Sequence, residues 1–128
     1  MRKLIYIFIL AAAFTACEKS QDLNCLVTLN VEIDGQDAPI SVAADHSLAG
    51  TMFRNINTLE NYTIPVIAGG TTQMQVLKGI YMIAFDADAI LADGSSRRVR
   101  SSQYSSPEKA VNLTDNNCTV TLKLIVLQ

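Results

Sequence analysis

The sequence predicts an all-β fold, an antiparallel sandwich of two sheets with about seven strands. Apolar and polar residues alternate with a period of two along much of residues 25–128, which is typical of half-buried strands. Turn residues recur at short intervals between these segments, and none of the segments carries the 3.6-residue apolar stripe of an amphipathic helix. Several short strands with this spacing favour two packed antiparallel sheets.

The first and last predicted strands, residues 25–33 and 118–127, alternate most regularly. The apolar face of the first holds Cys25, Val27, Leu29, Val31 and Ile33, and that of the last holds Cys118, Val120, Leu122, Leu124 and Val126. Cys25 and Cys118 thus both point inward, and neighbouring strands would make a disulfide between them geometrically reasonable. Two buried thiols are the alternative, since the sequence does not give the Cα separation that a disulfide requires.

The middle of the chain contains shorter strands separated by turns. Asp34-Gly35 and Gly69-Gly70 are typical tight-turn sequences. Pro65 cannot donate a ladder hydrogen bond and therefore favours an edge position for its strand. A near-continuous apolar run at residues 80–85 suits a central strand. The strands predicted here cover residues 39–44, 51–57, 62–68, 72–77, 80–85 and 110–113.

Residues 86–107 have the weakest periodicity, and we expect a mobile excursion between strands, with a short strand around Val99 as an option. This segment carries the sharpest charge feature of the chain, Arg97, Arg98 and Arg100, followed by Tyr104. The guanidinium groups are candidate contacts for an acidic glycan or a carboxylate-rich partner, and the tyrosine ring could stack on a sugar. The alternative is a solvated loop that keeps this region soluble.

The N-terminus has the pattern of a secretory signal. Arg2 and Lys3 precede the uncharged run of residues 4–16, which is shorter than the roughly 18–20 residues of a membrane-spanning helix. Thr15-Ala16-Cys17 resembles the bacterial lipobox, a resemblance that implies cleavage before Cys17 and lipidation of its sulfur. We therefore expect a signal peptide at 1–16, a lipidated tether at 17–24 and a β-sandwich domain at 25–128. An ordinary signal peptide cleaved nearby is the alternative.

The segment from Thr72 to Ala87, which contains Lys78-Gly79-Ile80-Tyr81 before an apolar run, resembles the "strand, Gly, x, Tyr, strand" unit of transthyretin-like sandwiches. Residues 110–113 and 118–127 are similar to the closing strand pair of these domains. Such domains include carboxypeptidase regulatory-like domains and lipoprotein subunits of Bacteroidota fimbriae. The acidic segment after Cys17 also resembles export signals of Bacteroidota lipoproteins. The resemblance implies an outer-membrane lipoprotein, periplasmic or surface-exposed, that is associated with fimbriae.

Catalytic and metal-binding patterns are scarce. His46 is the only histidine and sits in Asp45-His46-Ser47, which we interpret as a polar loop because a triad requires groups that meet in space. Asp86, Asp88 and Asp93 lack the spacing of a calcium loop, so neither a metal nor a cofactor is predicted. Loss of residues 1–16 lowers the formal charge from −2 to −4, which disfavours nucleic acid as a partner.

Three functions follow as hypotheses. The first is a non-catalytic, lipid-anchored envelope module that binds or assembles other surface proteins, with a fimbria-associated subunit as one form of it. The second is an accessory lipoprotein that binds a glycan or another ligand through the arginine segment. The third, and least favoured, is a hydrolase that uses an aspartate with His46.

Overall fold

The computed structural model describes residues 23–127, which are all-β apart from one 3₁₀ turn. The predicted signal peptide and Cys17 lie outside the described residues. The elements are β1 (Asn24–Ile33), β2 (Ser41–Ala44), β3 (Met52–Asn55), β4 (Ile67–Ala68), β5 (Thr71–Leu77), β6 (Gly79–Ile90), β7 (Ser96–Tyr104), η1 (Pro107–Lys109), β8 (Val111–Leu113) and β9 (Asn117–Leu127). Among these residues, no helix has the length and apolar character needed to cross a bilayer.

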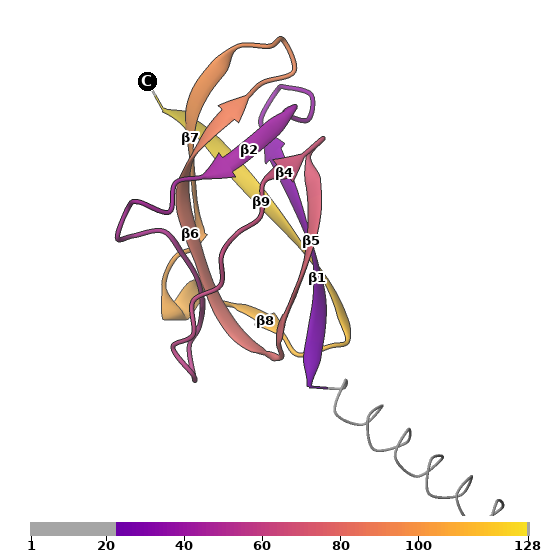
Figure 1. The fold of residues 1–128 in the computed structure, drawn as a ribbon, viewed down its shortest axis with the longest axis vertical. Coiled ribbons are helices and arrows are strands. Elements are labelled where there is room, and N and C mark those ends of the chain that lie inside the picture. The colour runs from indigo at the N-terminus through magenta and orange to yellow at the C-terminus, as the bar shows by residue number, and fades with distance from the viewer. Residues whose placement is uncertain (1–22, 128) are drawn as a thin grey trace, which may run out of the picture.

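The strands form one continuous sheet that closes on itself (Figure 1). The order is β2-β4-β5-β1-β9-β7-β6, and β6 returns to pair with β2. The predicted all-β class is therefore confirmed, whereas the prediction of two separate antiparallel sheets is corrected to a closed barrel of seven strands. One pair, β1 with β9, is parallel, because the first and last strands both run from the lower to the upper end of the molecule in Figure 1.

Strand β6 is the element that joins the two sides of the barrel. Over its twelve residues it pairs with β2 and β3 along one edge and with β7 and β8 along the other. A shift in register between Ile83 and Phe85 lets it bend, as a bulge does in a sheet that closes. Strand β8 pairs with β6 rather than with β9, so the predicted closing pair of residues 110–113 and 118–127 is wrong.

Two other segments differ from the predictions. Residues 86–107 are mostly strand, because β6 extends to Ile90 and β7 begins at Ser96, and together they form a hairpin. The predicted strand at residues 62–68 shrinks to Ile67–Ala68. Pro65 lies in the unpaired part of that segment, where strand pairing does not require the N–H that proline lacks.

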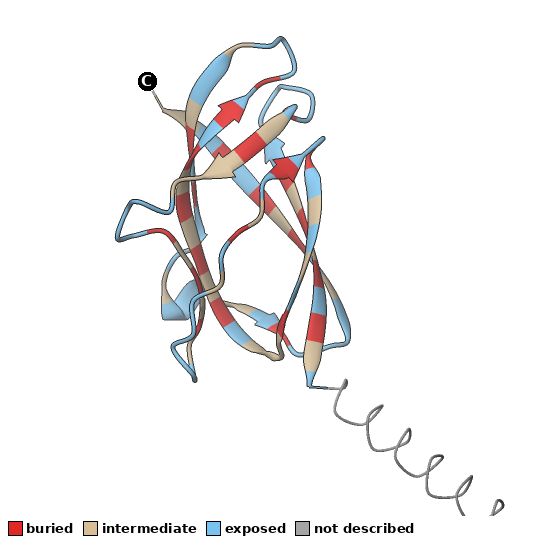
Figure 2. Ribbon diagram, viewed as in Figure 1, coloured by how far each residue is buried: buried red, intermediate tan, exposed pale blue. Residues whose placement is uncertain are grey.

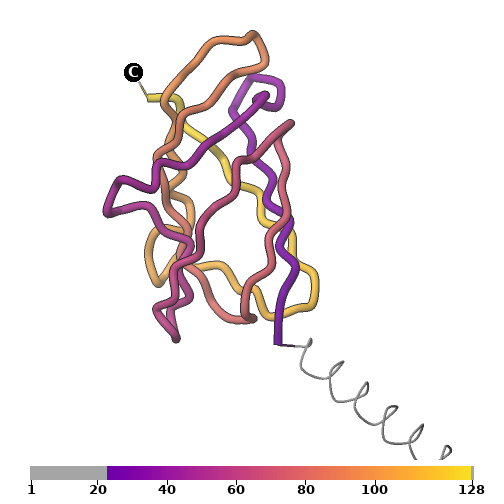
Figure 3. The backbone as a smooth tube through the Cα atoms, in the orientation of Figure 1, coloured from indigo at the N-terminus to yellow at the C-terminus, as the bar shows by residue number. Residues whose placement is uncertain are grey.

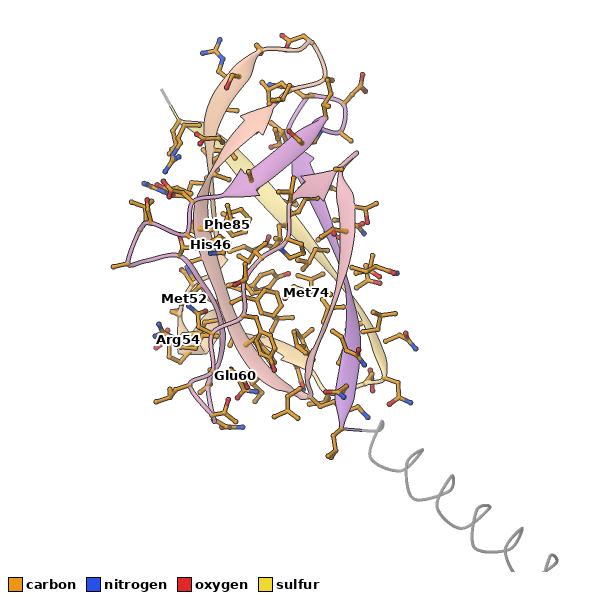
Figure 4. All side chains as sticks on the ribbon, in the orientation of Figure 1. His46, Met52, Arg54, Glu60, Met74 and Phe85 are labelled. Atoms are coloured by element: carbon orange, nitrogen blue, oxygen red, sulfur yellow. The ribbon has the colours of Figure 1, made fainter. Side chains whose placement is uncertain are left out.

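The alternation predicted for the strands places one large core inside the barrel (Figure 2). Three rings meet in it: Phe53 lies 5.2 Å from Tyr81 and 6.5 Å from Tyr62, measured between ring centroids. Burial raises the pKa of the Tyr81 phenol to about 12, and its O–H donates to the carbonyl of Leu77 at 2.6 Å. Figure 4 shows Met74 directed into the same interior.

The close approach of the Asn55 side chain explains why the Gly-x-Tyr unit has a glycine at position 79. The Asn55 side chain is buried, and its Oδ1 accepts hydrogen bonds from the N–H groups of Asn57 and Thr58 at 2.9 and 3.1 Å. A Cβ at Gly79 would lie 2.6 Å from Asn55 Nδ2, closer than two such atoms can approach. The glycine is therefore needed to leave room for an amide that closes the turn after β3.

The two ends of the barrel differ in the segments that form them (Figures 1 and 3). At the lower end, β1 begins beside the β5–β6 turn, where the N–H of Lys78 donates to the carbonyl of Leu23 at 2.9 Å. We call this the proximal end. At the upper end, the turn after β1 lies near the β6–β7 turn, and we call this the distal end. The chain thus enters the barrel at the end opposite to these two turns.

Candidate functional site

Two of the three candidate arginines form a ladder of ion pairs on the outer face of the β6–β7 hairpin. Arg100 lies opposite Asp86, and its Nε and one terminal nitrogen donate to the two carboxylate oxygens at 2.7 and 3.1 Å. Arg98 lies opposite Asp88 and donates to it at 3.0 Å. The Arg100 guanidinium lowers the pKa of Asp86, as expected when a cation stabilises the charged form.

Asp45 adds a third carboxylate from the loop after β2. Its Oδ2 accepts a hydrogen bond from Arg98 at 2.5 Å, and its Oδ1 accepts from the N–H and the hydroxyl of Ser47. These bonds, with those of Ser47 first, lower the pKa of Asp45 to about 2. Asp45 is thus held by Ser47 and Arg98, while the neighbouring His46 lies 3.3 Å from the carbonyl oxygen of Ile64. The Asp45-His46-Ser47 sequence therefore shows no triad geometry.

The four candidate contact residues do not form one surface. Arg98 and Arg100 lie on the outer face and bind carboxylates of this chain, whereas Tyr104 is at the far end of β7 and packs partly against the core. Arg97 has the opposite strand parity and lies at the distal end. The prediction of a combined arginine and tyrosine site is not supported by this arrangement, because the side chains face different parts of the surface.

The distal end contains an open depression of about 730 Å³. Arg97 lines it together with Asp37, from the turn after β1, and Asp93, from the β6–β7 turn. Within residues 23–127, Arg97 forms no ion pair at 4.0 Å or less. The N–H and hydroxyl of Ser95 lower the pKa of Asp93 by hydrogen bonding to its carboxylate. Two carboxylates and one guanidinium suit neutral hydroxyl-bearing ligands better than acidic ones.

The sequence did contain a signal for the ion-pair ladder. Asp93-Gly94 is a tight-turn sequence, and Gly94 has a φ of +87°, which favours glycine. Asp86 and Arg100 are each seven residues from position 93, and Asp88 and Arg98 are each five residues from it. A hairpin folded about Asp93 therefore opposes each aspartate to an arginine. The pairing of Arg98 with Asp45, 53 residues away, has no comparable local signal.

The two cysteines lie on neighbouring strands, as the disulfide hypothesis requires. In the parallel pair of β1 and β9, Cys118 lies opposite Val27, one inward position beyond Cys25. The structure has both as free thiols, with Cys25 buried and Cys118 half-buried. Burial first, and then the neighbouring Cys118 thiol, raises the pKa of Cys25 to about 12. The thiolate of Cys25 is therefore strongly disfavoured in the reduced fold.

The chain was compared with protein families, curated proteins and solved structures, and none of these comparisons gives a match. Within residues 23–127, no three His, Cys, Asp or Glu side chains are grouped so that they could hold a metal ion. The arrangement offers hydrogen-bonding groups at the distal depression and at a sheet edge.

Strand β5 has one edge that is only partly paired. It bonds β1 along its whole length on one side, but on the other side only Thr71 pairs, with Ala68 of β4. Farther along the same edge, the N–H of Leu77 donates to the hydroxyl of Tyr62 at 3.1 Å. The backbone groups of Gln73 and Gln75 face this edge and have no hydrogen-bond partner among the described residues. Such an edge can accept a strand from another chain.

Proposed function

We propose that this chain is a lipid-anchored, non-catalytic module of the bacterial cell envelope that binds or assembles other surface proteins. The observation that carries the proposal is Cys17, with small residues before it and an apolar run before them. Lipid on this cysteine would hold the protein at the outer membrane, and two or more acyl chains are needed for durable attachment. The export resemblance after Cys17 favours exposure at the cell surface.

The open edge of β5 supports assembly as the mode of binding. A partner strand placed beside Gln73 and Gln75 would form main-chain hydrogen bonds, which provide affinity without a deep pocket. The side chains at Gln73 and Gln75 are exposed, so a neighbouring strand could approach without displacing the core. A fimbria-associated subunit is the particular form that we favour, because polymers of surface proteins commonly grow by adding strands.

Cross-linking in intact cells tests this function. We expect C-terminally tagged protein to recover other envelope proteins when Cys17 is intact, and Cys17→Ser to lose membrane attachment and these partners together. Gln75→Pro removes an N–H that faces the open edge, a position where a strand tolerates proline, so it should keep the fold and the lipid but lose the partners. Mass spectrometry of the recovered material, with circular dichroism of each variant, gives the readout. Unchanged recovery in Gln75→Pro would exclude the β5 edge, and recovery of no protein partner would exclude assembly.

The distal depression favours one second candidate, an accessory lipoprotein that binds a neutral glycan. Its lining combines two carboxylates with a guanidinium that forms no ion pair within residues 23–127, and all three groups can hydrogen-bond hydroxyl groups. It also lies at the end of the barrel opposite to the point where the chain enters, so a lipid at the N-terminus would leave it open to solvent. This location suits capture of a ligand away from the membrane.

Calorimetric titration with neutral hexasaccharides of glucose and of mannose tests the second candidate. Because Arg97 makes no ion pair among the described residues, we expect Arg97→Ala to weaken binding at least tenfold while leaving the melting temperature within about 2 °C, as surface substitutions usually do. Lys109→Ala, an exposed substitution in η1, is the matched control and should bind normally. Equal binding by both variants would place the glycan elsewhere, and binding by neither the parent nor the variants would reject this candidate.

A further inference from the structure

The proximal end carries a group of exposed apolar side chains. Leu59 and Leu23 are 70% and 61% exposed, and Ile80 and Leu26 are 41% and 37% exposed. We call these four residues the proximal apolar patch. They account for four of the nine large apolar side chains that are exposed among residues 23–127. The other five, Ile40, Leu48, Val66, Ile90 and Ile125, lie on other parts of the surface.

Backbone hydrogen bonds connect the segments that carry three of these residues, Leu23, Ile80 and Leu59. The carbonyl of Leu23 accepts from Lys78, two residues before Ile80, at 2.9 Å, and the carbonyl of Ile80 accepts from Ile56 at 2.9 Å. Ile56 begins the turn that holds Leu59, and the N–H of Leu59 donates to the carbonyl of Asn55 at 2.9 Å. The β5–β6 turn thus lies between the start of the chain's first strand and the turn of Leu59.

Leu59 is an independent sign of function at this end. It has a φ of +63° and is the only non-glycine residue among those described with a positive φ. This left-handed conformation is unfavourable for leucine, and glycine or asparagine would adopt it more readily. The chain therefore tolerates backbone strain at Leu59, which carries the most exposed large apolar side chain of residues 23–127. Strain of this kind is often found where a residue is needed for binding.

The predicted anchor determines what lies against this end. Residues 17–22 separate Cys17 from Leu23, and six residues span at most about 20 Å when extended. Strand β9, with eleven residues, is about 35 Å long. A lipid on Cys17 would therefore hold the proximal end within about 20 Å of the bilayer. This distance is shorter than the length of the barrel. We propose that the proximal apolar patch rests in the interfacial region of the lipid bilayer, an inference that depends on the proposed lipidation.

The charged side chains at this end indicate whether the contact depends on the charge of the lipid. Lys78 lies between β5 and β6, and its Nζ donates to Asn116 Oδ1 at 2.6 Å, while Asp115 precedes Asn116 and Glu60 follows Leu59 in the chain. With both signs present, attraction to anionic lipid is not the driving force. Four partly exposed side chains bind weakly alone, and the anchor makes their contact effective by raising the local concentration of lipid.

The absence of tryptophan from the chain allows a direct test. Leu59→Trp, in the full lipidated protein on phosphatidylcholine vesicles, should show blue-shifted emission and at least twofold quenching when the acyl chains carry bromine. Leu23→Trp should behave in the same way if the first variant folds poorly. Ile125→Trp is the matched control: Ile125 is 60% exposed but lies eight residues along β9 from the proximal end, about 26 Å away, and its emission should not be quenched. Adding 30% phosphatidylglycerol should leave all three results unchanged.

The possible outcomes separate this inference from the proposed function. If the protein does not float with the vesicles, the lipid anchor itself is absent. If it floats but Leu59→Trp and Leu23→Trp are quenched no more than Ile125→Trp, the patch does not touch the bilayer and the inference is wrong. A blue shift that depends on protein concentration and not on lipid would identify a second copy of the chain as the occupant, and it would equally overturn the membrane contact.

A further variant separates binding from stability. Leu59→Gly accommodates the positive φ and removes the apolar side chain. We expect it to raise the melting temperature and, when combined with Leu23→Trp, to reduce the quenching by brominated lipid. A side chain with a purely structural role would give a lower melting temperature on removal, and that result would refute the strain argument.

Discussion

Gly79→Ala is expected to lower the free energy of unfolding by about 2–4 kcal/mol. The added Cβ would lie 2.6 Å from Asn55 Nδ2 and 3.3 Å from its Cγ, so either the strand or the buried amide must move. Overpacking of this kind costs about 1–3 kcal/mol, and the loss of a hydrogen bond to a buried polar group costs about 1–3 kcal/mol. Urea denaturation followed by circular dichroism measures the change.

Two further variants distinguish this mechanism from a general intolerance of glycine substitution. Gly50→Ala is the matched control, because no atom lies within 4 Å of a Cβ built at Gly50, and it should change stability by no more than about 0.5 kcal/mol. In an Asn55→Ala background, Gly79→Ala should cost much less, since the clashing amide is gone. Equal costs in both backgrounds would show that Asn55 is not the reason for the glycine.

The strands were predictable where alternation was strong and local. The first and last strands, and the turn glycines at Gly35 and Gly69, follow from residue types within a few positions of each other. Closure of the barrel was not predictable in this way. It depends on which edges of β6 pair with β2 and β7. Alternation predicts which face of a strand is buried, but it does not predict which strand pairs beside it.

The β6–β7 hairpin was missed for a physical reason. Beside Val99, the buried inward positions of its central part are Ala87, Ala89 and Ser101, which contribute little to an apolar pattern. Its outward positions carry the aspartates and arginines of the ion-pair ladder, which suggested a solvated loop. Across two strands, opposite charges pair and stabilise the sheet by about 0.2–1 kcal/mol each, an effect that single-strand patterns do not reveal.

The candidate site was predicted only in part. The arginines are the sharpest charge feature of the sequence, but the prediction from sequence did not connect them with Asp45 and Asp86, which bind two of them. A guanidinium that is already bound to two carboxylates offers little to an acidic ligand. The sequence did not indicate the positive φ of Leu59, because leucine is not a residue type that predicts this conformation in a turn.

Folding under oxidising conditions is expected to join Cys25 and Cys118. Cys25 and Cys118 occupy neighbouring inward positions of the paired strands β1 and β9, and the predicted envelope location permits disulfides. Because the bridge would close a loop of more than 90 residues, loop entropy predicts a gain of about 4.5 kcal/mol over the reduced form, and strain reduces typical values to about 2–4 kcal/mol. Urea denaturation of the oxidised and the reduced protein measures the difference.

The timing of oxidation decides whether this bridge forms. In the reduced fold, Cys25 is fully buried and its pKa is about 12, so the nucleophilic thiolate is scarce and an oxidant cannot reach it. We therefore expect a bridge when the unfolded chain refolds in a glutathione redox buffer, and slow oxidation of protein that has already folded. Mass spectrometry after alkylation counts the remaining thiols. Cys118→Ser is the control and should be equally stable with and without oxidant. If both thiols can still be alkylated after oxidative refolding and stability does not increase, then β1 and β9 hold these cysteines as a reduced pair.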